Sequence, residues 1–242
     1  MKISESSSIH PTVVIEGEVE IGPSVEIGPF CLIKGPVKIG ERSILASHCV
    51  IQGPVEIGKN NRINPHCIIG TEPESRGQQS SGKIRIGDGN ILTEQSVITH
   101  GTTPEGTQVG NHNYFLSNVH ISHDCVLGNN ITVAHNVVLG GNVLIQDGAT
   151  IGIAAAIHQN STIGAYSMIG MNSVVTKDVP PFALVLGNPI KFKKWNSYQL
   201  EKLGMAEFPS GELYEQYLSE FHSISKRAIL HIPEVVEKNT ND

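Results

Sequence analysis

An aliphatic residue at every sixth position is the feature that most constrains the fold of this chain. The series runs without a miss through Ile15, Ile21, Ile27, Ile33, Ile39, Leu45, Ile51, Ile57, Ile63 and Ile69. It resumes at Ile86, Leu92 and Ile98 after one insertion, and continues from Val109 to Val175 after a second. A period of six fits neither an amphipathic helix nor a simple alternating strand, so the hexad itself must be the structural unit.

The hexads predict a solenoid. Three of them would form a triangular coil of 18 residues, with the aliphatic side chains on the axis and the Gly-rich positions at the corners. Adjacent coils would pair as parallel strands about 4.8 Å apart, so residues separated by 18 positions should lie one above another. Cys31, Cys49 and Cys67 have this spacing. We therefore predict a mainly β fold, a parallel β-helix of hexapeptide repeats, in which these thiols form a buried column.

Two insertions interrupt the repeat and are predicted to be surface loops, where functional residues are often found. The first covers about residues 71–83 (TEPESRGQQSSGK) and the second about residues 101–107. Beyond Val175 the repeat is expected to end at VPPFALVLGNP, because proline cannot donate a hydrogen bond to a strand ladder.

A helical pattern replaces the hexads in the last part of the chain. Leu200 and Leu203 precede Gly204, and Ser210 is a plausible N-cap for apolar residues at three-and-four spacing from Leu213 to Phe221. The chain is thus expected to have a solenoid domain over residues 1–190 and a C-terminal α-helical region over 191–242.

Composition limits the possible partners. The 242-residue chain has a net charge of −6, which argues against a general nucleic-acid partner. Neither a signal peptide nor an apolar run of membrane-spanning length is found, so we expect a cytoplasmic protein without an integral membrane segment. The four Cys occupy small-residue positions of hexads and form no Cys-x-x-Cys pair, which favours a role as core fillers over metal ligands or disulfides.

The densest group of chemically active side chains is the stretch NVHISHDC, with His120, His123 and Asp124. Steps of 18 lead from His123 to Gly141 and Gln159, and from Ser122 to Gly140 and His158. A neutral His can take a proton from a hydroxyl or amine, and an unobstructed Gly N–H can face a developing oxyanion. Asp124 can orient His123 only if the backbone bends there, because consecutive strand residues point to opposite faces. His48, His66, His100, His112 and His135 are interpreted as surface or corner residues.

The hexads, NVHISHDC, the segment AAIHQ at 155–159 and the run DVPPFALVLGNP together resemble the UDP-N-acetylglucosamine acyltransferases, within the left-handed parallel β-helix acyltransferases. The resemblance implies the left hand of the coil and a homotrimer with active sites between subunits. It also implies a cytoplasmic reaction, the first of lipid A synthesis. An acyl carrier protein thioester would donate a 3-hydroxyacyl chain to the 3-hydroxyl of UDP-N-acetylglucosamine, without a metal or further cofactor.

Matched position by position, the resemblance makes His123 the general base, Asp124 its partner and Gly141 the donor to the oxyanion. It places further residues in the substrate cleft, namely His120, His158, Gln159, Asn196 and Lys202.

Four positions depart from the family pattern. The first insertion lacks the Gln-Asp-Leu-Lys segment that contacts the nucleotide sugar, and Arg76 would replace its cation. Asn142 stands where the family usually has His, and His100 lacks the Arg that normally follows it. Met171 occupies a Gly position, where it should block the groove for a long acyl chain and favour a shorter one.

Three other interpretations are consistent with the residues. The altered loop and Met171 favour a sugar N-acetyltransferase that uses acetyl-CoA on a nucleotide-linked amino sugar. A zinc-dependent hydratase on the same scaffold would need three His around one ion across a subunit boundary. A scaffold without catalysis is the remaining alternative, against which the column of His123, Gly141 and Gln159 argues.

Overall fold

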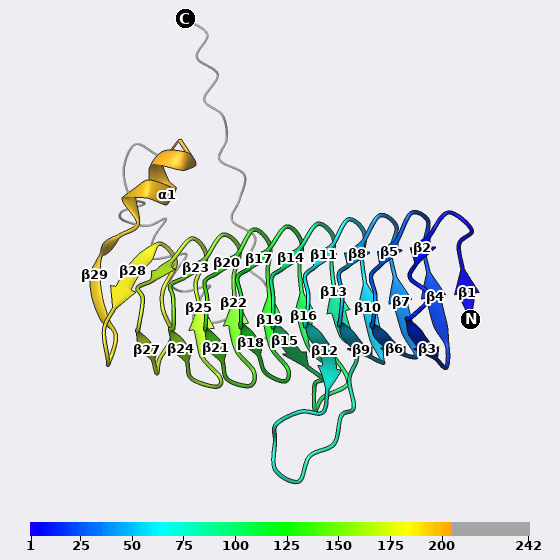
Figure 1. Ribbon diagram of the computed structural model, residues 1–242. Coiled ribbons are helices and arrows are strands. Elements are labelled where there is room, and N and C mark those ends of the chain that lie inside the picture. The colour runs from blue at the N-terminus through cyan, green and yellow to red at the C-terminus, as the bar shows by residue number, and fades with distance from the viewer. Residues whose placement is uncertain (205–242) are drawn as a thin grey trace, which may run out of the picture.

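The computed structural model describes residues 1–204, which form a long triangular prism of stacked coils (Figure 1). Three parallel sheets make its faces, and each coil contributes one short strand to each sheet in turn. The predicted parallel β-solenoid is confirmed, while its left hand stays a prediction. No helix in these 204 residues is long and apolar enough to cross a membrane.

Up to Val175 each sheet contains every third strand, and the last two strands both join the second sheet. The first sheet contains β1 (Lys2–Ile3), β4 (Val19–Ile21), β7 (Val37–Ile39), β10 (Val55–Ile57), β13 (Ile84–Ile86), β16 (Gln108–Val109), β19 (Val126–Leu127), β22 (Leu144–Ile145) and β25 (Thr162–Ile163). The second contains β2 (Ser8–Ile9), β5 (Glu26–Ile27), β8 (Ile44–Leu45), β11 (Arg62–Ile63), β14 (Ile91–Leu92), β17 (Tyr114–Phe115), β20 (Thr132–Val133), β23 (Thr150–Ile151), β26 (Met168–Ile169), β28 (Ala183–Leu186) and β29 (Lys191–Trp195). The third contains β3 (Val14–Glu16), β6 (Leu32–Lys34), β9 (Val50–Gln52), β12 (Ile68–Thr71), β15 (Val97–Thr99), β18 (His120–Ile121), β21 (Val138–Leu139), β24 (Ala156–Ile157) and β27 (Val174–Val175).

The strand register follows the predicted step of 18, as in the pairing of Val19 with Val37 and of Val37 with Val55. Each insertion lengthens the step once. Val55 pairs with Ile84 across the first insertion, and Arg85 pairs with Gln108 across the second. From Ile21 to Val175 every aliphatic or aromatic member of the hexad series is at most 3% exposed. The sixfold pattern is therefore the core of the solenoid.

The four thiols fill this core as predicted. Cys31, Cys49, Cys67 and Cys125 are free and at most 1% exposed. Burial raises the pKa of Cys67 to about 11 and that of Cys125 to about 12. Burial therefore keeps these two thiols protonated at neutral pH.

The corners differ in detail from the prediction. The Gly that follows the aliphatic residue does not take a left-handed conformation, but it lets two coils approach: a Cβ on Gly40 would lie 2.5 Å from the carbonyl of Gly58. The left-handed position comes two residues later and is occupied by other residue types, such as Asn60 and Asn142 with φ of 54° and 58°. Asn tolerates this region better than most residues.

The hexad repeat ends before VPPFALVLGNP as predicted, but strand pairing continues beyond the repeat. The hexad period stops at Val175, but β28 still pairs in parallel with β26, and Val179 forms a bridge with Ile163. Pro180 and Pro181 lie in the turn before β28, where no ladder donor is needed. The antiparallel strand β29 then closes this end, and α1 (Ser197–Lys202) follows it. The helix expected from Ser210 lies outside the described residues.

The outward row of the third sheet is apolar along almost its whole length. Its members alternate with core residues and pair from coil to coil: Val14, Leu32, Val50, Ile68, Val97, His120, Val138, Ala156 and Val174. Val14 and Val138 are 51% and 49% exposed. Exposed apolar surface of this extent usually marks an interface, and His120 is its single polar member.

Candidate active site

His123 and Asp124 lie at the corner that follows β18. Asp124 has a left-handed φ of 60°, so the chain bends there and the two adjacent side chains point to the same side. His123 Nδ1 lies 2.9 Å from Asp124 Oδ2. The condition set from the sequence is thus met. Because an ionised carboxylate only accepts hydrogen bonds, Nδ1 carries the proton and Nε2 keeps its lone pair.

Asp124 is held by the second insertion. Thr102 donates to its Oδ2 from the hydroxyl (2.7 Å) and the backbone N–H (3.0 Å), and Thr103 donates to its Oδ1 in the same way (2.6 and 3.1 Å). Burial favours the neutral carboxyl, but the hydrogen bonds from Thr103, Thr102 and His123 outweigh it and hold the pKa of Asp124 well below its usual range. Asp124 is therefore a fixed negative charge beside the imidazole.

The other edge of the His123 imidazole faces the next coil at Gly141. A Cβ on Gly141 would lie 2.4 Å from both Cε1 and Nε2 of His123, so only glycine leaves room for the ring. The side chain of His123 is 14% exposed. Within residues 1–204 the Gly141 N–H donates to no other group. Nε2 of His123 and the unpaired N–H of Gly141 thus lie on adjacent coils, as the step of 18 predicts.

The first insertion also reaches this region. Glu74 Oε2 lies 3.2 Å from Nε2 of His120, whose side chain is 23% exposed, although the two atoms lack the alignment of a hydrogen bond. The insertions are joined to each other, because Ser81 donates to Gly101 O (3.0 Å) from its N–H and to Thr102 O (2.5 Å) from its hydroxyl. The two joined insertions therefore contact His120 and Asp124. Both loops leave the prism next to each other below β12 and β15 (Figure 1).

His100 lies at the corner after β15, but it is buried and is not the surface residue that we predicted. It is 2% exposed and lies one coil before His123, two residues past the pair of Ile98 with Ile121. Its Nε2 is 2.9 Å from Gln52 O, and its Nδ1 has no partner among the described residues. His48, His66 and His112 do lie at exposed corners, with φ near 60°.

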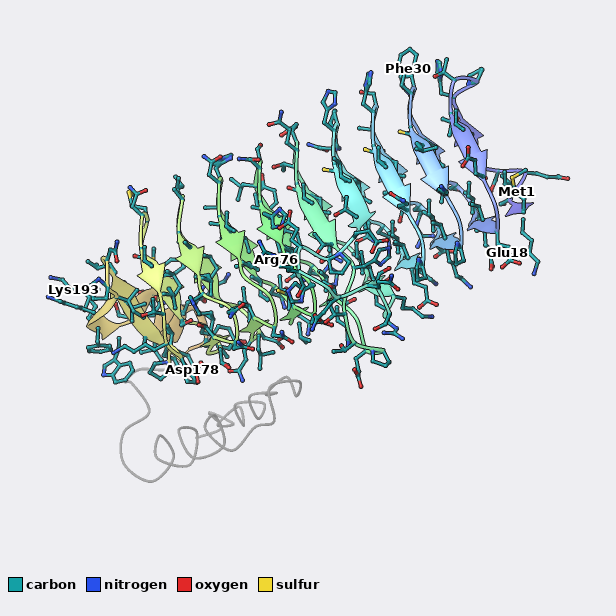
Figure 2. The ribbon with its side chains drawn as sticks, turned by 90° about the horizontal axis from the view of Figure 1, so that it is seen from below. Met1, Glu18, Phe30, Arg76, Asp178 and Lys193 are labelled. Atoms are coloured by element: carbon teal, nitrogen blue, oxygen red, sulfur yellow. The ribbon has the colours of Figure 1, made fainter. Side chains whose placement is uncertain are left out.

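Gln159 continues the predicted column of His123 and Gly141, because β18, β21 and β24 pair at a step of 18 and Asn160 N donates to Gly141 O (2.9 Å). His158 and Gln159 are both exposed, and Met171 is 67% exposed on another corner. Asn196 is buried and caps α1, while Lys202 lies in the last turn of that helix. Arg76 is exposed on the first insertion, near the middle of the prism, whereas Lys193 marks its C-terminal end (Figure 2).

Sequence reasoning missed Glu74, Thr102 and Thr103. Both threonines follow the strand β15 in the segment His-Gly-Thr-Thr, and short hydroxyl side chains after a Gly are frequent partners of a carboxylate in turns. That local signal was available, but the carboxylate they bind lies 21 and 22 positions further along the chain.

Comparison with known proteins shows the family of this chain. The family model described as bacterial transferase hexapeptide (six repeats) matches residues 36–71. The acyl-(acyl-carrier-protein)–UDP-N-acetylglucosamine O-acyltransferase of Aliivibrio salmonicida is 45% identical over 193 residues, which cover 78% of this chain and 73% of that protein. The chain belongs to the UDP-N-acetylglucosamine O-acyltransferase family.

Other members of the family extend this likeness. The Psychrobacter cryohalolentis protein with the same name is 54% identical over 142 residues, which cover 58% of this chain and 55% of that protein. The crystal structure of UDP-N-acetylglucosamine O-acyltransferase from Moraxella catarrhalis superposes with a TM-score of 0.79 at 33% identity and covers 89% of this chain and 85% of that one. The Campylobacter jejuni acyltransferase gives 0.78 at 28% identity, over 91% of this chain and 86% of that one.

Proposed function

We propose that this protein transfers a 3-hydroxyacyl chain from an acyl carrier protein thioester to the 3-hydroxyl of UDP-N-acetylglucosamine, the first step of lipid A synthesis. Family membership supports the donor and the acceptor. The observation that carries the chemistry is the contact of His123 with Asp124 on one edge of the ring and with Gly141 on the other.

In the proposed reaction, His123 Nε2 takes the proton of the sugar 3-hydroxyl as the oxygen attacks the thioester carbonyl carbon. The carbonyl oxygen becomes an oxyanion, to which the Gly141 N–H donates a hydrogen bond. The tetrahedral intermediate then expels the thiolate, and the imidazolium returns the proton to the sulfur. Asp124 stabilises the imidazolium between these two transfers. The thioester is itself the activated donor, so the scheme needs no cofactor beyond it.

The proposal includes a homotrimer with the site between subunits. A single chain leaves the apolar row of the third sheet exposed, and His120 and Val138 are neighbours in that row, so an interface there would border the site. A neighbouring subunit would then face the column of His123, Gly141 and Gln159 with His158 beside it, and would supply the further cleft residues Asn196 and Lys202. Light scattering tests this, and a monomer would contradict it.

Met171 is proposed to limit the length of the acyl chain. It shares a column with Ile153, one coil earlier, since Asn172 N donates to Ile153 O at 2.8 Å. Both apolar side chains are well exposed, at 67% and 45%. A groove that passed this corner would be narrowed by two large side chains in succession, which favours a short or medium chain.

Arg76 is proposed to contact the diphosphate of the nucleotide sugar, because a guanidinium suits phosphate and its loop already contacts the site through Glu74. The reaction is proposed to take place in the cytoplasm, where the carrier protein and the nucleotide sugar are available.

One competing activity has specific support. Met171 and Ile153 would equally suit an acetyl group carried by coenzyme A, with a nucleotide-linked amino sugar as acceptor. The deciding experiment offers UDP-N-acetylglucosamine with 3-hydroxyacyl carrier proteins of several lengths, and in parallel an amino-sugar nucleotide with acetyl-CoA. Ester product with the carrier proteins alone supports the proposal, and amide product with acetyl-CoA alone would replace it. A metal analysis tests the zinc hydratase alternative.

A further inference from the structure

The two oxygens of Asp124 have different partners. Among residues 1–204, Oδ1 accepts from Thr103 alone, through the hydroxyl and the N–H. Oδ2 accepts from the hydroxyl and N–H of Thr102 and also lies 2.9 Å from His123 Nδ1. Thr103 thus holds the oxygen that points away from the imidazole, whereas Thr102 shares an oxygen with the imidazole.

This arrangement is closely packed. The Asp124 side chain is 1% exposed, and a Cβ on Gly101 would lie 2.6 Å from Oδ1, so the insertion backbone lies directly against the carboxylate. Thr107 fixes the other side: its hydroxyl accepts from Asp124 N (3.0 Å) and donates to Thr99 O (2.9 Å). The second insertion is therefore built around Asp124.

We propose that Thr102 and Thr103 are positioning residues of the reaction with separate tasks. Thr103 fixes the rotation of the Asp124 carboxylate, and Thr102 draws part of the charge of Oδ2 away from His123. Together they set the direction and the strength of the hydrogen bond between Asp124 and His123. This inference rests on the proposed function, in which His123 is the base.

The separate tasks follow from the geometry. A carboxylate that loses the donors on Oδ1 can turn about its Cβ–Cγ bond, so the imidazole loses its fixed orientation and the proton transfer becomes less well aligned. A carboxylate that loses the Thr102 hydroxyl keeps its anchor on Oδ1 but presents more charge to His123. The imidazolium is then held more tightly and releases its proton less readily.

Substitutions at the two threonines leave the other titratable residues near His123 in place. These residues are His100 in the preceding coil, His120 with Glu74 beside it, Glu105 in the second insertion and His158 on a later coil. A change in pH dependence is therefore assigned to the contact between Asp124 and His123 when the NMR resonance of His123 Nδ1–H changes with it.

The test compares Thr102→Val with Thr103→Val, since valine has the shape of threonine without its hydroxyl. Thr102→Val is expected to move the acidic side of the kcat/KM profile to higher pH, with KM at the pH optimum unchanged. Thr103→Val is expected to lower kcat about tenfold, the rate equivalent of one hydrogen bond to a charged group, with a smaller movement of the profile. The corresponding serine variants restore the hydroxyl and should restore both properties.

Thr150→Val on the outward row of the second sheet is the matched control and should behave as the wild type. Identical behaviour of Thr102→Val and Thr103→Val, or a wild-type profile in both, would overturn the separate tasks. If the serine variants do not restore activity, the threonine side chains act through packing and not through their hydroxyls. That result would also overturn the inference.

A second readout keeps this inference separate from the proposed function. The Nδ1–H proton of His123 gives an NMR resonance that is identified by its loss in His123→Ala and needs no substrate. It should move downfield in Thr102→Val and broaden through faster exchange in Thr103→Val. If the wild type shows no acyl transfer, the proposed function fails while this resonance still tests the inference. An unchanged resonance in both variants contradicts it.

Discussion

Gly141→Ala adds one methyl group at the point where the coil after His123 faces the imidazole. The backbone of Gly141 is not left-handed, so alanine can adopt its conformation without strain. The new Cβ would lie 2.4 Å from Cε1 and Nε2 of His123, whereas ordinary contacts begin at 3.4 Å. The substitution therefore acts on the imidazole and leaves the fold of the corner intact.

The size of the effect follows from that distance. The ring must withdraw by about 1 Å, and a displacement of that size costs about 100-fold in rate when it affects the reacting group. The movement also strains the 2.9 Å contact between Nδ1 and Asp124. Stability should fall by only about 1 kcal/mol, the low end for overpacking, because the ring has a side open to solvent along which it can move.

The assay measures product by mass spectrometry at saturating UDP-N-acetylglucosamine, and the melting temperature is recorded for each variant. The double variant His123→Ala/Gly141→Ala is the control. Without the imidazole the new methyl group meets no ring, so the double variant should melt like His123→Ala alone and should be no less active than it. Wild-type kcat in Gly141→Ala would refute the placement of His123 against Gly141.

Four further outcomes are expected. Met171→Gly should let longer acyl chains be transferred, measured with a series of carrier-protein donors; unchanged chain selection would contradict its role. Val138→Arg places a charge in the apolar row of the third sheet and should yield monomers in light scattering, whereas an intact trimer would move the interface elsewhere. Asp124 has a lowered pKa in the folded protein, so it contributes stability that is present above about pH 4 and lost as the pH falls. At pH 7 the free energy of unfolding of Asp124→Asn, measured by urea denaturation, should therefore be about 1–3 kcal/mol lower than that of the wild type, because donors are left unsatisfied. The difference should shrink in acid. The four buried thiols should react with a thiol reagent only on unfolding, and rapid reaction of the native protein would contradict the core assignment.

The fold could be predicted because the hexad pattern and the core are the same set of residues. Each aliphatic residue of the series lies in one strand, and the step of 18 determines which strands pair. The same step predicts Gly141 next to His123, and the structure confirms it: a Cβ on Gly141 would lie 2.4 Å from the ring. The bend at Asp124 was stated as a condition, and a left-handed φ of 60° meets it.

The insertions were predicted as surface loops, but their conformation could not be predicted in this way, because their sequences have no repeat. The second insertion also hides the relation between His100 and His123: these residues are 23 positions apart, as are the paired residues Val97 and His120. Counting back by 18 from His123 therefore leads to Glu105 and not to His100. Thr102 and Thr103 were missed for the same reason, since their contact with Asp124 depends on the conformation of an irregular loop.

The step of 18 also leads to His158 and Gln159, and the register keeps that step, whereas Asn196 and Lys202 were identified by resemblance alone. Asn196 serves in this chain as the N-cap of α1, and its amide donates to Tyr166 O at 2.8 Å. A position in a cleft depends on the neighbouring subunit, which neither the hexad pattern nor the strand register describes.

The central claim is that His123 is the base of an acyl transfer to UDP-N-acetylglucosamine. Its most direct test is the kcat/KM of His123→Ala relative to the wild type with a 3-hydroxyacyl carrier protein, on protein shown to have the same oligomeric state and melting temperature. General base catalysis contributes about 100- to 10,000-fold, so a loss of that size is predicted. A variant that transfers the acyl chain at the wild-type rate would contradict the proposed chemistry.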